Sequence, residues 1–96
     1  MEMRVKAKFF AMLRELVGVG EEEYEVEPGT TVHDLLFKHV PQKHRNISDL
    51  WAKKVSDLLH ERHGIYIIIV NGYRVDLSQE LKDGDVVAIL PPVGGG

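Results

Sequence analysis

The six C-terminal residues are the clearest candidate in this sequence for a chemically reactive segment. This tail reads Pro91-Pro92-Val93-Gly94-Gly95-Gly96 and directly follows an apolar segment. Two prolines stiffen the chain into an extended neck, and glycines without Cβ atoms make a tip slim enough to enter a narrow tunnel. The Gly96 carboxylate is inert until activated. Adenylation by an ATP-using enzyme would supply a leaving group, after which a sulfur donor, an amine or a thiol could take the acyl carbon.

No other part of the sequence offers a complete reactive site. Cysteine is absent, which removes disulfides, thiolate metal ligands and a thiol nucleophile. His60 and His63 stand three residues apart, but such a pair gives two metal ligands where a stable site needs three or four. No serine stands in a nucleophile elbow, and no glycine-rich loop joins a strand to a helix. We therefore expect no metal, no bound cofactor and no independent active site.

Length and composition indicate one domain, residues 1–96, with a flexible tail over 91–96. Apolar residues make up 44% and charged residues 28% of the chain, and no apolar run is long enough to cross a bilayer. The formal net charge is −3 and the twelve lysines and arginines are scattered, which argues against a nucleic-acid partner. The chain starts with a strand pattern rather than an apolar export signal, so we expect a cytoplasmic protein without a membrane partner.

The first strands are predicted from a hydrophobic period of two. Apolar residues alternate with lysines over 5–9 and with glutamates over 23–26, which predicts a hairpin joined by a long connection over 10–20. Opposite charges on paired strands stabilise a hairpin by roughly 0.2–1 kcal/mol a pair. The solvent face is expected to set Lys6 and Lys8 against Glu23 and Glu25.

Two amphipathic helices are expected next along the chain. Thr31, with Asp34 three residues later, resembles a capping box, and Pro41 is expected to end the first helix. The second helix is predicted from about Ile47 to Arg62. Its apolar stripe consists of Ile47, Leu50, Trp51, Val55, Leu58 and Leu59.

The last third of the chain returns to strand patterns. Residues 65–70 are almost wholly apolar and β-branched, which predicts a strand in the middle of the sheet that is buried on both faces. Asn71-Gly72 predicts a hairpin turn into a short strand over 73–75, and Asp83-Gly84-Asp85 predicts a turn before a final strand over 86–90. This order indicates an α+β domain with helices packed on one face of a mixed sheet.

Three stretches carry a family resemblance that spans nearly the whole chain. They are VKAKFFAMLREL over 5–16, Ile69-Val70-Asn71-Gly72, and the segment from Asp83-Gly84-Asp85 to the tail. In these stretches the sequence resembles the small-subunit family of molybdopterin synthase, the MoaD/ThiS sulfur carriers. The ending Pro-Pro-Val-x-Gly-Gly is typical of the molybdopterin carriers, whereas the thiamine carriers end in Gly-Gly without the proline pair.

The resemblance implies a ubiquitin-like β-grasp fold with a mixed sheet of about four to five strands. It implies that an E1-like enzyme uses ATP to adenylate Gly96, and that a sulfur donor protein then supplies sulfur to make a thiocarboxylate. Gly94 and Gly95 would thread with Gly96 into the large subunit of a molybdopterin synthase. Sulfur would pass there to a pyranopterin precursor of the molybdenum or tungsten cofactor, and the catalytic side chains would belong to the partner.

The candidate partner interface comprises Phe10, Arg14, Tyr73, Arg74, Pro91 and Pro92. Strand alternation would point Phe10 away from Phe9; alternatively, both rings belong to the core and Arg14 is a solvated helix residue. Three alternative functions also remain open. They are protein modification by capture of the Gly96 adenylate on lysines, sulfur delivery of the thiamine type, and a plain interaction domain with an inert tail.

Overall fold

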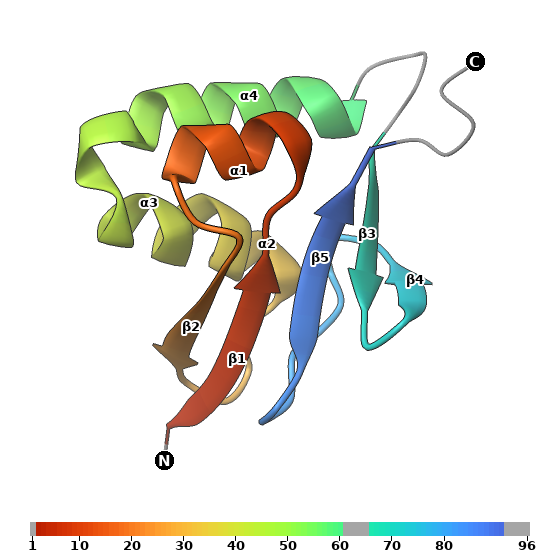
Figure 1. The fold of residues 1–96 in the computed structure, drawn as a ribbon. Coiled ribbons are helices and arrows are strands. Elements are labelled where there is room, and N and C mark those ends of the chain that lie inside the picture. The colour runs from red at the N-terminus through yellow and green to blue at the C-terminus, as the bar shows by residue number, and fades with distance from the viewer. Residues whose placement is uncertain (1, 61–65, 92–96) are drawn as a thin grey trace.

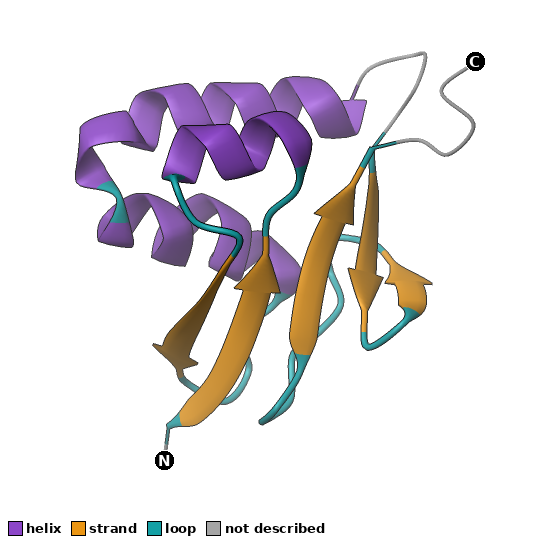
Figure 2. Cartoon of the chain, in the orientation of Figure 1, coloured by secondary structure: helices purple, strands orange, loops and turns teal. Residues whose placement is uncertain are grey.

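A five-stranded mixed sheet covered by helices on one face organises the computed structural model, which describes residues 2–60 and 66–91 (Figure 1, Figure 2). The strands are β1 (Met3–Lys8), β2 (Glu21–Val26), β3 (Ile67–Val70), β4 (Tyr73–Val75) and β5 (Val86–Leu90). The helices are α1 (Ala11–Val17), α2 (Val32–Asp34), α3 (Val40–Lys43) and α4 (Ser48–His60). A π-helical segment, η1 (Leu35–His39), joins α2 to α3, and a 3-10 turn, η2 (Arg45–Ile47), precedes α4.

The strand order is β2-β1-β5-β3-β4. β1 and β5 run parallel, and the other neighbouring strands run antiparallel. The predicted α+β architecture with a mixed sheet is therefore confirmed. No helix of the described residues is both long enough and apolar enough to span a membrane.

The hairpin of β1 and β2 forms as predicted, with one difference in charge pairing. Lys6 lies opposite Glu23, as expected, but Lys8 lies opposite Glu21. Lys6 also forms an ion pair with Glu21, its diagonal neighbour on β2, with 3.2 Å between Lys6 Nζ and Glu21 Oε2. A glutamate is available at every second position of β2, so sequence alternation alone does not choose among these partners.

The connection between β1 and β2 contains a helix, α1, that the periodicity does not predict. It is seven residues long and buries only Leu13, so it has no apolar stripe to detect. Ala11, at its start, has a φ of 50°. Gly18 ends it with a φ of 88° and donates its backbone N–H to the Arg14 carbonyl. This left-handed ending is one that glycine adopts without steric cost.

The first predicted helix begins as expected and ends later than expected. Thr31 Oγ1 accepts from the Asp34 N–H, and Asp34 accepts from the Thr31 N–H, which completes the capping box. The prediction that Pro41 ends the helix is wrong, because helical structure continues to Lys43. The π-helical segment brings the Val40 N–H to the Leu35 carbonyl. Pro41 then occupies the first turn of α3, where no donated N–H is needed.

The core is built where α4 meets the inner face of the sheet. Trp51 is fully buried, and its indole Nε1–H donates to the Leu36 carbonyl oxygen at 2.7 Å. Its ring meets Phe9 edge to face, with the ring centroids 5.5 Å apart. Val55 is also fully buried, as predicted. Leu50 is 54% exposed, so its assignment to the buried stripe is wrong. It lies one residue before Trp51, about 100° around the helix from the inward face.

The strand predicted for the middle of the sheet is an interior strand, paired with β5 and β4, but it is neither the central strand nor buried on both faces. β5 occupies the centre of the sheet, between β1 and β3. Along β3, Ile68 and Val70 are buried while Ile67 and Ile69 are half-buried. Helices cover only one face of β3, and side chains alternate between the faces. Ile65, like the predicted helix end at Arg62, lies outside the described residues.

Candidate functional site

The tail leaves the sheet at the end of its central strand. β5 ends at Leu90, which pairs with Ile67 of β3, and Pro91 follows it and is partly buried. Strands on both sides hold β5, so the base of the tail has a fixed position. Pro92, Gly94, Gly95 and Gly96 lie outside the described residues, and their roles stay predictions.

An apolar surface lies on the face of the sheet opposite the helices, beside the base of the tail. We call it the open sheet face. Ile67 lies opposite Leu90, and Ile69 opposite Ala88, so β3 and β5 present adjacent rows of half-buried apolar side chains. Among the described residues, no helix covers this face (Figure 2). Its apolar members are Ile67, Ile69, Val86, Ala88 and Leu90.

Basic side chains flank the open sheet face on both sides. On β1, Lys6 lies beside Val86 and Lys8 beside Ala88. On β4, Arg74 lies opposite Ile69 and is exposed. An apolar centre with a charged rim is typical of a protein interface. Sequence reasoning missed this surface because a run of β-branched residues looks the same whether one or both faces of its strand are covered.

The aromatic pair at the end of β1 divides between the core and the surface. Phe9 is 2% exposed, whereas Phe10 is 37% exposed. The backbone of Phe10 is extended, with φ −130° and ψ 156°, so its side chain continues the strand alternation onto the side of Lys8. The opposite orientation of the two rings is therefore confirmed. Arg14 is exposed, and its side chain lies over Gly20. A Cβ added at Gly20 would be 3.5 Å from the guanidinium carbon of Arg14.

The structure separates the two β4 candidates. Arg74 belongs to the rim of the open sheet face, as described above. Tyr73 lies opposite Val70, on the other side of the sheet, and is 76% exposed. A hollow of about 390 Å³ next to β4 is lined in part by Tyr66, Ile67 and Arg74. Ile67 and Arg74 therefore line this hollow as well as belonging to the open sheet face and its rim, whereas Tyr73 lines neither.

Comparison with known proteins decides the family. The ThiS family model matches residues 7–96, which include β5 and the tail. The chain belongs to the ThiS family. A molybdopterin synthase sulfur carrier subunit of Escherichia coli is 36% identical over 92 residues, which cover 96% of this chain and 99% of that protein. A small archaeal modifier protein 3 of Haloferax volcanii is 31% identical, covering 98% of this chain and 100% of that protein.

A solved structure supports the same assignment for this ThiS-family chain. It is a putative molybdopterin converting factor, subunit 1, from Pyrococcus furiosus, with 34% identity and a TM-score of 0.66. The match covers 95% of this chain and 99% of that one. The ubiquitin-like β-grasp fold implied by the sequence resemblance is thus confirmed.

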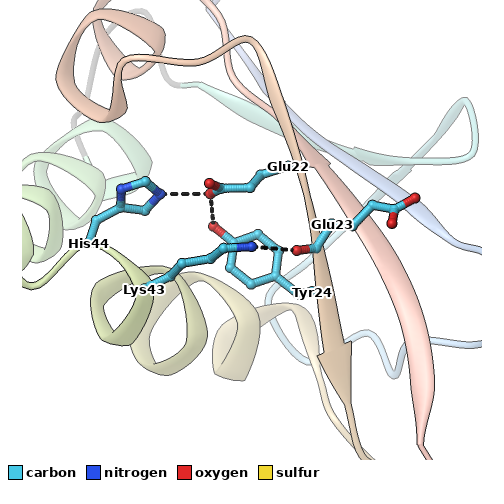
Figure 3. Close-up of polar contacts among 5 residues, drawn as sticks. All are labelled: Glu22, Glu23, Tyr24, Lys43 and His44. Carbon is cyan, nitrogen blue, oxygen red and sulfur yellow. Dashed lines mark hydrogen bonds and ion pairs between the residues drawn. The ribbon is translucent and has the colours of Figure 1, made fainter.

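A polar cluster joins β2 to the end of α3, away from the tail (Figure 3). Glu22 Oε1 lies 2.6 Å from His44 Nε2 and accepts from the Tyr24 hydroxyl at 2.7 Å. Lys43 Nζ donates to the Glu23 carbonyl oxygen at 2.8 Å and lies 4.8 Å from the centroid of the Tyr24 ring. β1 lies between β2 and β5, so the cluster stabilises the packing of the edge strand β2 against α3 and does not contact the base of the tail.

Electrostatics in this cluster favour an ionised Glu22. Burial alone would raise the pKa of Glu22, but hydrogen bonds from His44 and Tyr24 outweigh it and lower that pKa. Burial and the neighbouring Glu22 both raise the pKa of the Tyr24 hydroxyl, so the phenol stays protonated and donates. Within residues 2–60 and 66–91, no three histidine, aspartate or glutamate side chains gather as metal ligands. His63 lies outside those residues, so the absence of a metal stays a prediction.

Proposed function

We propose that this chain is the sulfur carrier subunit of a molybdopterin synthase and that Gly96 is its working residue. The observation that carries the proposal is the family match over residues 7–96 together with a Pro-Pro-Val-Gly-Gly-Gly ending on the central strand. The Escherichia coli relative, covered almost end to end, bears the name of this function. The proline pair favours it over a carrier of the thiamine type.

The proposed cycle has three chemical steps at the Gly96 carboxyl. A carboxylate oxygen attacks the α-phosphorus of ATP on an E1-like enzyme, which releases pyrophosphate and leaves an acyl adenylate. A persulfide on a sulfur donor protein then attacks the acyl carbon and AMP leaves. A second thiol cleaves the resulting sulfur–sulfur bond, which frees the thiocarboxylate. None of these steps needs a catalytic side chain from this chain.

The chain would then deliver sulfur to the large subunit of the synthase. We propose that the large subunit docks on the open sheet face, with Phe10 and Arg74 at its margin. Burial of the apolar rows beside Leu90 would hold the base of the tail while Gly94, Gly95 and Gly96 thread into the partner. Ordering those glycines costs on the order of 1–2 kcal/mol per residue, which body contacts must offset. The acceptor there would be the pyranopterin precursor.

Intact mass spectrometry tests the proposal directly. The chain is incubated with an E1-like activating enzyme, ATP and a sulfur donor, beside a variant that lacks Gly96. We expect the full chain to gain the mass of one oxygen exchanged for sulfur, and the variant to gain nothing. Absence of that gain, with the enzyme active on a control carrier, would overturn the proposal.

The protein-modifier alternative is tested on the same sample with candidate acceptor proteins added. Peptide mapping would show Gly96 joined to lysines if the adenylate is captured by amines. We expect the thiocarboxylate without such isopeptides. Isopeptides without any thiocarboxylate would replace sulfur transfer with protein modification as the function.

A further inference from the structure

The turn between β3 and β4 places an asparagine side chain between two segments of the chain. Asn71 and Gly72 both have positive φ, 52° and 89°, as a tight hairpin turn of this kind requires. The Asn71 Nδ2–H donates to Asp85 Oδ1 at 2.7 Å. Its Oδ1 accepts from the Val86 N–H at 2.9 Å. Both polar atoms of the side-chain amide are thus engaged with the start of β5.

An asparagine followed by glycine is also the sequence most open to internal cyclisation. The Gly72 backbone nitrogen, unshielded by a Cβ, can attack Cγ of Asn71. A carbon–nitrogen bond forms, the bond from Cγ to Nδ2 breaks, and ammonia leaves with the proton given up by Gly72. Water then opens the succinimide ring to aspartate or isoaspartate. We propose that Asn71 is a deamidation site of this protein and that Asp85 and Val86 hold the reaction back in the folded state.

Two features of the contacts oppose ring closure. The side chain must swing Cγ over the Gly72 nitrogen, which removes Oδ1 from the Val86 N–H. Donation to a carboxylate also leaves more electron density on Nδ2, which makes it a poorer leaving group. Asp85 itself is fixed, because it is only 9% exposed and its Oδ2 accepts from the Lys82 N–H at 2.8 Å.

The expected protection follows from the strength of these bonds. A hydrogen bond to a charged group changes an equilibrium constant by roughly tenfold to a hundredfold. If cyclisation proceeds from molecules in which Asn71 has left Asp85, the folded chain should react at least about tenfold more slowly than the unfolded chain.

The product would not fit the place that Asn71 occupies. A carboxylate at position 71 has no hydrogen to donate and would face the Asp85 carboxylate at hydrogen-bond distance. Like charges at that distance repel. The side chain would lose its hydrogen bond to Asp85, whereas the backbone N–H of residue 71 would still donate to the Val86 carbonyl. Each conversion should therefore leave a molecule of lower stability with one more negative charge.

Rates of deamidation test the proposal. Wild type, folded and in urea, is incubated at mildly alkaline pH beside folded Asp85→Ala, Asp85→Asn and Asp83→Ala. Intact mass counts amides converted to acids, and peptide mapping locates the site. Asp83 is the matched control, because it lies in the same turn as Asp85 but its Oδ1 accepts from the Arg4 N–H, at 2.9 Å, rather than from Asn71.

We expect folded wild type to convert at least about tenfold more slowly than unfolded wild type, at position 71. Asp85→Ala should remove most of that protection, and Asp85→Asn, which restores an acceptor oxygen, should recover part of it. Asp83→Ala should accelerate conversion only by the factor that its measured loss of stability predicts, through a larger unfolded population. Equal rates in folded and unfolded wild type, or equal acceleration by the two alanine variants at equal stability, would overturn the proposal.

Discussion

Replacing Glu22 by glutamine should lower the stability of the fold in a way that depends on pH. The Glu22 and His44 side chains are 18% and 16% exposed, and Glu22 Oε1 lies 2.6 Å from His44 Nε2. Glutamine keeps one oxygen for the Tyr24 hydroxyl, removes the negative charge and replaces the other oxygen with an NH2 group. A hydrogen bond to a charged group such as the Glu22 carboxylate is worth roughly 1.5–3 kcal/mol, and partial exposure reduces that value. We therefore expect a loss of about 1–2 kcal/mol in the free energy of unfolding near neutral pH.

The sign of the pH dependence follows from the lowered pKa of Glu22. The folded state stabilises the ionised form of the Glu22 carboxyl group relative to the unfolded state. This stabilisation is fully present above the ordinary glutamate pKa, about 4.3, and is lost as the pH falls through the folded pKa. Wild type and Glu22→Gln should therefore differ most near neutral pH and converge in acid.

Urea unfolding at a series of pH values measures this difference. The single tryptophan, Trp51, is buried and reports unfolding by its fluorescence. Glu25→Gln is the matched control, since Glu25 is exposed on the same strand, and it should stay within about 0.5 kcal/mol of wild type. His44→Gln and the double variant complete a cycle that isolates the pair. A constant gap between wild type and Glu22→Gln from acid to neutral pH, or a coupling of zero, would refute the reasoning.

Two further substitutions test the local structure. Thr31→Ala removes the capping-box acceptor of the Asp34 N–H and should cost about 1 kcal/mol in the free energy of unfolding. Trp51→Phe removes the donor to the Leu36 carbonyl and leaves unfilled volume in the core, so it should cost about 2–4 kcal/mol. Both are measured by urea unfolding followed by circular dichroism, and a Trp51→Phe cost below that of Thr31→Ala would contradict this account of the core.

Features governed by neighbouring residues could be predicted from the sequence. The capping box at Thr31 needs two side chains on one turn, and the turn at Asn71-Gly72 needs two residues that accept positive φ. The alternation of β1 and β2 likewise records which residues face inward. Each of these predictions rests on contacts or conformations within a few residues of chain.

Features governed by the rest of the fold could not be predicted in this way. Pro41 stays within helical structure because the π-helical segment before it changes the hydrogen bonding, and no local pattern announces that segment. Which face of β3 is covered depends on where α4 packs, so its apolar run could not reveal the half-buried side of Ile67 and Ile69. The tail was identified by composition, whereas the open sheet face beside it required the strand order.

The position of Leu90 allows docking to be separated from chemistry. Leu90 is half-buried on the open sheet face and precedes Pro91, so a charge there should disrupt the proposed docking without altering the proposed reactive residue, Gly96. We expect Leu90→Lys to weaken binding to the large subunit at least tenfold by calorimetry. Deletion of Gly96 should instead abolish sulfur loading and weaken that binding far less, because the apolar rows remain.

Glu25→Lys supplies the control for added charge, since Glu25 lies on the edge strand β2 and not beside β5. It should bind the large subunit within about threefold of wild type, a change of less than 1 kcal/mol. Equal weakening by Leu90→Lys and Glu25→Lys would mean that net charge rather than the open sheet face governs association. If deletion of Gly96 weakened binding as much as Leu90→Lys, the tail would supply most of the docking energy and the body contacts would be secondary.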